Sequence, residues 1–157
     1  MISAFASSLL TWIGDLTRTY TRSKREKAYL CIRVAVTLDA YALSCAEALK
    51  AAAAHYAQTK YPLGITLPEP LAYPADINWE SIDPKLAYRL MSFLNECEAL
   101  AAQARYAQHF ENNPFDIEDA ARSAGKKAYE LANVVRRAAN LSPSDLTRGL
   151  DGLIDAN

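Results

Sequence analysis

Apolar residues recur along residues 24–59 at alternating spacings of three and four, which is the pattern of a heptad seam on an α-helix. The seam consists of Ala28, Cys31, Ala35, Leu38, Ala42, Cys45, Leu49, Ala52 and Tyr56. A second apolar stripe, formed by Ile32, Val36 and Leu43, flanks it. A helix that is apolar on more than one side is typically buried on more than one side, so we expect 24–59 to be a long central helix.

Two later segments show the same spacing. Asp83 is a good N-cap and Pro84 suits the first helical position, so a second long helix should begin there and end near Asn112-Asn113. Its seam is Leu86, Leu90, Phe93, Cys97, Leu100, Ala104 and Ala107. A third helix is predicted from about Asp116 to Leu141, with the seam Ile117, Ala121, Ala124, Ala128, Leu131, Val135 and Ala138.

The segment 61–84 between the first two helices carries five prolines and cannot form a regular element. It contains four acidic residues and no basic one. Its apolar side chains predict a strap that crosses the helices, anchored by Leu67, Leu71, Tyr73, Ile77, Trp79 and Ile82.

Few glycines, many alanines and no hairpin signal favour an all-α fold. The connections at 112–115 and 141–143 are short, which indicates antiparallel neighbours. We therefore predict that 1–157 is a single domain, an up-and-down antiparallel helical bundle. It should contain three long heptad-patterned helices, short N- and C-terminal helices (2–16 and about 143–155) and the Pro-rich strap.

Residues 2–16 form an amphipathic pattern, with Ile2, Phe5, Ala6, Leu9, Ile13 and Leu16 on one face and Trp12 at its edge. As a helix this segment reaches roughly 22 Å, which is short of the ~30 Å hydrocarbon core of a bilayer. No basic n-region precedes it, so a secretory signal peptide is not expected.

A basic cluster follows the amphipathic segment and contains Arg18, Arg22, Lys24, Arg25 and Lys27. Three interpretations remain open for the pair of features. The helix could pack on its own bundle, with the charges facing solvent or the acidic strap. It could lie on an anionic membrane surface. It could bind a protein partner or a second copy, with Phe5, Leu9, Trp12 and Ile13 as contact residues.

Composition excludes several classes of function. The 157 residues are 51% hydrophobic and 22% charged, with a net charge of −1, so no overall field favours nucleic acid. Three cysteines without a CxxC pair predict neither a disulfide scaffold nor a zinc site, and they indicate a reducing, cytoplasmic compartment. No phosphate loop, dinucleotide fingerprint or nucleophile elbow is present, so no cofactor, metal or small-molecule substrate is predicted.

Arg105 and His109 share a helix face and resemble the arginine–histidine motif of HEPN-type ribonucleases, which are also helical bundles. The spacer here, Tyr106 to Gln108, is shorter than in that family. The resemblance implies an RNase in which the histidine moves a proton and the arginine stabilises phosphate charge. Asp39 flanks the seam and is interpreted as a structural polar group with satisfied hydrogen bonds, for which a tyrosine hydroxyl from a neighbouring helix could serve as partner.

The preferred functional prediction is a non-enzymatic helical-bundle protein that binds a protein partner or self-associates. The alternatives are a peripheral protein held at the cytoplasmic membrane face by residues 2–27, and the HEPN-like RNase.

Overall fold

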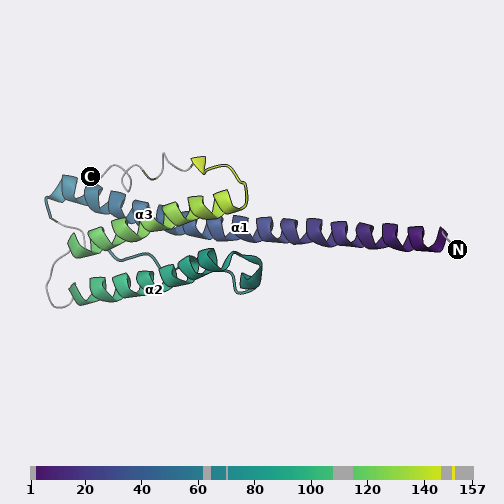
Figure 1. Ribbon diagram of the computed structural model, residues 1–157. Helices are drawn as coiled ribbons and strands as arrows, with labels where there is room; N and C mark the ends of the chain where they lie inside the picture. The colour runs from purple at the N-terminus through teal and green to yellow at the C-terminus, as the bar shows by residue number, and fades with distance from the viewer. Residues whose placement is uncertain (1–2, 62–64, 70, 108–114, 146–149, 151–157) are drawn as a thin grey trace.

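The computed structural model describes residues 3–61, 65–69, 71–107, 115–145 and 150, with side chains from residue 20 onward except at 115 and 116. Within these ranges the chain is largely helical and forms no strand, which confirms the all-α class. The elements in order are α1 (Ser3–Thr59), the 3-10 helix η1 (Trp79–Ser81), α2 (Pro84–Tyr106) and α3 (Phe115–Ala138) (Figure 1). The predicted C-terminal helix lies largely outside the described residues.

Helix α1 joins the two helices that the sequence predicts separately at 2–16 and 24–59. The 57 residues form one helix because the segment between them contains neither proline nor glycine, and nothing interrupts its hydrogen bonding. The helix ends where Lys60 adopts a left-handed conformation (φ 62°) and donates its N–H to the Tyr56 carbonyl at 2.9 Å. Pro62 follows shortly after.

The heptad seam of α1 is buried from Cys31 to Ala52, while Ala28 is half-buried and Tyr56 is exposed. The second stripe does not behave as predicted. Ile32 and Val36 are exposed. The additional buried positions are instead Leu30, Val34, Tyr41 and Ala46. The two apolar stripes point to different sides of α1, and the chain covers only one of them.

Local capping chemistry sets the boundaries of the other two helices. The Asp83 carboxylate accepts the N–H groups of Lys85 and Leu86 at 3.0 and 3.1 Å, so α2 begins at the predicted cap. Helix α3 ends in a Schellman turn, in which Asn140 (φ 55°) is left-handed and the Leu141 N–H reaches the Arg136 carbonyl at 2.9 Å.

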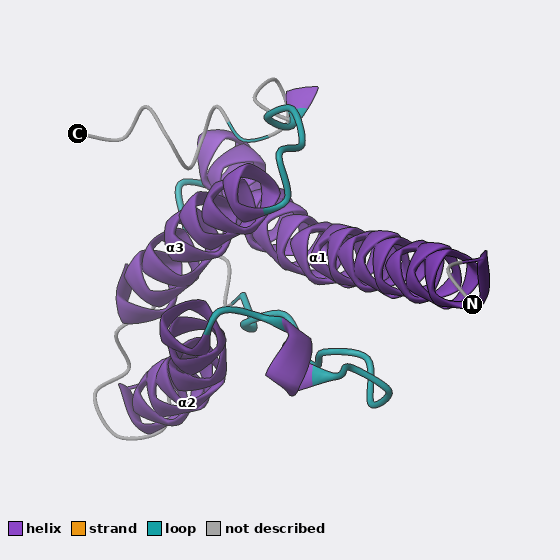
Figure 2. Ribbon diagram, turned by 45° about the vertical axis from the view of Figure 1, so that its right-hand side comes forward, coloured by secondary structure: helices purple, strands orange, loops and turns teal. Residues whose placement is uncertain are grey.

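Helix α3 lies between α1 and α2 and packs against both (Figures 1 and 2). Tyr41 of α1 contacts Phe93 of α2 edge to face, with the ring centroids 6.4 Å apart. Beyond the C-terminal end of α1, Ile65 lines one pocket with Ala104 near the end of α2 and Ile117 near the start of α3. Helices α1 and α2 therefore run in the same direction, and α3 runs opposite to both.

This order differs from the up-and-down arrangement that the sequence predicts. The reason is the length of the strap, which carries the chain back along the molecule before α2 begins (Figure 1). The antiparallel relation that the short second connection predicts does hold for α2 and α3.

The strap is attached by its apolar side chains. Leu71, Ile77 and Ile82 are buried, Leu67, Tyr73 and Trp79 pack on the core, and Ile65 is an anchor that the sequence did not reveal. Tyr73 and Trp79 meet edge to face at 5.4 Å, and the Tyr73 hydroxyl donates to the Leu90 carbonyl at 3.3 Å. Trp79, the strap anchor named from the sequence, is partly buried against the core.

Candidate functional site

The N-terminal half of α1 extends away from the rest of the molecule. Both views show no other element beside it (Figures 1 and 2). Among the side chains that the structure describes, the first buried one in α1 is Leu30. At ~1.5 Å per residue, the part of α1 before Leu30 reaches roughly 40 Å. We call residues 3–29 the projecting helix. Its backbone does not fold back onto the other described helices, which differs from the interpretation in which residues 2–16 pack on their own bundle.

The basic cluster lies near the base of the projecting helix, and its residues Arg22, Lys24 and Arg25 are exposed. Arg22 pairs with Glu26 one turn away at 2.9 Å, and the Lys24 ammonium lies 4.7 Å from the centroid of the Tyr20 ring. Arg25 is exposed. These local contacts keep the arginines and lysines on the helix surface, where a partner can reach them.

The remaining predicted contact residues are placed only by the helix backbone. The side chains of Phe5, Leu9, Trp12, Ile13 and Arg18 lie outside the described residues. Lys27, the last basic residue of the cluster, is half-buried at the point where the helix joins the body.

A sixth basic residue, Arg33, ties α1 to the acidic strap. Its two terminal nitrogens bind the Asp76 carboxylate at 2.8 and 2.7 Å, a bidentate geometry. These hydrogen bonds hold the pKa of Asp76 below its usual range. The guanidinium also lies 5.9 Å from the centroid of the Tyr29 ring. The pairing of basic helix and acidic strap, one of the sequence-based interpretations, occurs at this one residue among those described.

Next to Arg33, α1 presents an apolar stripe that no described element covers. The exposed fractions are 64% for Tyr29, 41% for Ile32 and 58% for Val36. Exposed β-branched side chains at helical spacing on a long helix are typical of a contact surface. The sequence showed Ile32 and Val36 as apolar positions but predicted their burial, because it did not show where the neighbouring helices lie.

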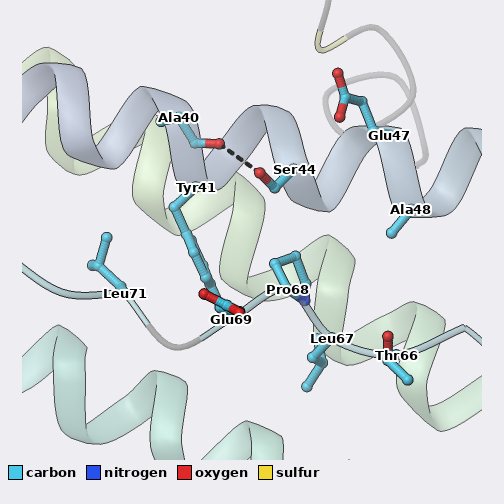
Figure 3. A pocket seen from close by; sticks show the side chains of 10 residues that line it. All are labelled: Ala40, Tyr41, Ser44, Glu47, Ala48, Thr66, Leu67, Pro68, Glu69 and Leu71. Carbon is cyan, nitrogen blue, oxygen red and sulfur yellow. Dashed lines mark hydrogen bonds between the residues drawn. The ribbon is translucent and has the colours of Figure 1, made fainter.

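An open groove of about 620 Å³ separates α1 from the strap. Figure 3 shows Tyr41 reaching from α1 toward Glu69, with Leu67, Pro68 and Leu71 of the strap below the helix. Ser44 donates back to the Ala40 carbonyl at 3.0 Å, and Glu47 points to the opposite side of α1 from Tyr41. Catalysis needs polar groups that converge on one point. The side chains that line this groove do not converge in that way.

The buried titratable groups are held in their neutral forms. Burial raises the pKa of the Tyr41 hydroxyl and of the neighbouring Cys45 and Cys97 thiols, that of Cys45 to about 12. Burial also raises the pKa of Cys31. A protonated, buried thiol is a poor nucleophile, so these cysteines act as small core residues.

The hydrogen-bond partner of Asp39 is an arginine and not a tyrosine. Its carboxylate pairs with the Arg136 guanidinium of α3, with one hydrogen bond of 3.2 Å and a second between Nη2 and Oδ2. Arg136 follows Val135 of the α3 seam, and no local signal in the sequence links it to Asp39. The pair is structural and joins α1 to α3.

The residues of the ribonuclease resemblance are only partly placed. Arg105 lies in the last turn of α2 and is exposed, while His109 lies outside the described residues. Within the described ranges, no group of three His, Cys, Asp or Glu side chains is close enough to hold a metal ion.

Comparison with known proteins adds no family: the chain matches no protein-family model, no curated protein and no solved structure. Among the described residues, Tyr20–Thr59 of α1 has the length and apolar composition of a membrane-spanning helix. Half of its most apolar window is buried inside the protein, and a core helix meets the same two criteria.

Proposed function

We propose that this protein is a non-enzymatic interaction protein that acts through α1 by binding a protein partner or a second copy of itself. The observation that carries the proposal is the projecting helix, which continues the central helix for roughly 40 Å away from the other described elements. Most helical stability in proteins comes from packing of an amphipathic face, and no other element that the structure describes lies beside this helix.

The sequence of the projecting helix supports contact with another molecule. Phe5, Leu9 and Ile13 recur on one side of the helix, and Ser7 and Thr11 occupy the other. We infer further that the alanine-rich seams of α1 and α3 pack at a shallow angle, as heptad spacing favours, which makes the body a rigid base for the projection.

A pair of matched variants of the full chain tests the proposal. Leu9→Asp with Ile13→Asp places two charges on the apolar side, and Ser7→Asp with Thr11→Asp places the same charges on the polar side. Sedimentation velocity over a wide concentration range, and affinity capture with each variant as bait, measure the association. We expect binding by the wild type and the polar-side variant and its loss in the apolar-side variant. Equal association by all three proteins would refute the role of this helix.

Surface attachment to an anionic membrane is the second candidate. The observation that favours it is the exposure of Arg22, Lys24 and Arg25 on one short stretch of the projecting helix, opposed only by Glu26. Each Lys or Arg near an anionic leaflet contributes about 1 kcal/mol, and salt screens this attraction. In this case the protein works at the cytoplasmic face of a membrane.

Co-sedimentation with anionic liposomes at low and high salt separates the two candidates. Salt-sensitive binding that is lost when the three basic residues are replaced by glutamine supports the membrane. Absence of binding at low salt rejects it.

A further inference from the structure

Seven positions lie on one face of α1, and the intervals between them are the same in either direction from Val36. From Arg25 to Glu47 the intervals are four, three, four, four, three and four residues, and the positions are Arg25, Tyr29, Ile32, Val36, Ala40, Leu43 and Glu47. Residues at these intervals lie on one side of an α-helix. A face of this kind can oppose a copy of itself that runs in the other direction.

The face is open in the structure. Arg25, Ala40 and Glu47 are exposed, as are the three apolar side chains of the stripe, and Leu43 is half-buried. Within the described part of the chain, neither Arg25 nor Glu47 forms an ion pair. Figure 3 shows Glu47 projecting from the other side of α1 than Tyr41, and both residues line the open groove beside the strap.

We propose that this face pairs α1 with α1 of a second copy, antiparallel, about a two-fold axis at Val36. The inference rests on the proposed function and names its partner. The axis places Val36 against the partner's Val36, Ile32 against the partner's Ala40, and Tyr29 against the partner's Leu43. Arg25 meets the partner's Glu47 at each end, so a two-fold interface contains two ion pairs.

Charge and size favour the antiparallel register over a parallel one. A parallel pair in register opposes Arg25 to Arg25 and Glu47 to Glu47, and like charges across an interface disfavour a complex. The antiparallel pair opposes unlike charges at both ends and sets the large Ile32 against the small Ala40. Asp39 joins the neighbouring surface of α1 to α3, and Arg33 joins it to the strap. Ala40 and Glu47 border the open groove beside the strap and remain exposed, so a partner helix can reach them.

Disulfide trapping in the full chain tests the register. Ile32→Cys and Ala40→Cys are both at exposed positions, and the three native cysteines are buried. Under mild oxidation, we expect a covalent dimer when the two variants are mixed and none when either is oxidised alone. A covalent dimer of Ile32→Cys alone would establish a parallel pair and overturn the proposal. Absence of any covalent dimer would also overturn it.

Charge reversal gives an independent readout by sedimentation equilibrium. Arg25→Glu and Glu47→Arg should each weaken self-association by roughly five- to thirty-fold, because two exposed pairs change from attraction to repulsion. Mixing the two variants should restore the wild-type affinity in a heterodimer. Lys24→Glu is the matched control, since it makes the same charge change at an exposed position outside the face.

The outcome separates this inference from the proposed function. The Leu9→Asp with Ile13→Asp variant should associate more weakly than the wild type but keep the Ile32–Ala40 crosslink at high protein concentration, because these substitutions lie outside the symmetric face. A wild type that is monomeric at all concentrations refutes the antiparallel pair. Capture of a different protein, or binding to liposomes, by that same monomer would still support a role for the projecting helix.

Discussion

Replacement of Asp39 by alanine should destabilise the fold more than loss of any other ion pair among the described residues. The Asp39 and Arg136 side chains are only 7% and 11% exposed, and they join α1 to α3 through two hydrogen bonds. The Arg136 Nη1 group has one further acceptor, the Asn133 amide oxygen at 3.5 Å. Without the carboxylate, the guanidinium remains in a largely dry site with little compensation.

The expected cost follows from this burial. Removal of one member of a buried pair costs about 3–5 kcal/mol, because the remaining charge is left unpaired. Domains of this kind are stable by about 5–15 kcal/mol, so Asp39→Ala removes a large part of the total. With a urea dependence of about 2 kcal/mol per molar, the unfolding midpoint should fall by roughly 2 M.

Urea denaturation followed by far-UV circular dichroism, at one fixed protein concentration, measures the effect. Glu26→Ala is the control, because the Arg22–Glu26 pair is exposed and its loss should change stability by only about 0.5 kcal/mol. The double variant Asp39→Leu with Arg136→Met should recover most of the stability, since it removes both charges and fills the space. A free energy of unfolding for Asp39→Ala within about 1 kcal/mol of the wild type would contradict this reasoning. So would a double variant whose loss of stability equals the sum of the losses in the two single variants.

Three further outcomes follow from the contacts. The native thiols should react with an aromatic disulfide reagent only on unfolding, because all three cysteines are buried and protonated; fast reaction of the native protein would contradict this. Stability measured by urea should be constant from neutral pH to about pH 8.5 and fall toward pH 12, since the unfolded chain ionises cysteines whose pKa the fold raises. Asp76→Asn should speed proteolysis of the strap and change Trp79 fluorescence at neutral pH, and acidification through the lowered pKa of Asp76 should do the same to the wild type. An Asp76→Asn strap that is cut no faster would show that its apolar anchors suffice.

The candidate site was only partly predictable from sequence. The basic cluster and the amphipathic spacing of 2–16 were visible as patterns, whereas the continuity of α1 through residues 17–23 was missed. That continuity is a local property, since those residues contain no helix breaker. The second stripe of Ile32, Val36 and Leu43 was recognised as apolar and taken to be covered, whereas Ile32 and Val36 are exposed.

Local chemistry in the sequence determined the helical elements, the Asp83 cap and the apolar anchors of the strap. Side-chain period, cap residues and proline act within a few positions along the chain, so they can be recognised without a structure. Only the tertiary structure decided that α1 and α2 run in the same direction, that Asp39 meets Arg136, and that the projecting helix extends away from the other described elements. These features depend on residues far apart in sequence. An apolar stripe shows that a helix face can be buried. The number and placement of the other helices decide which apolar face is covered.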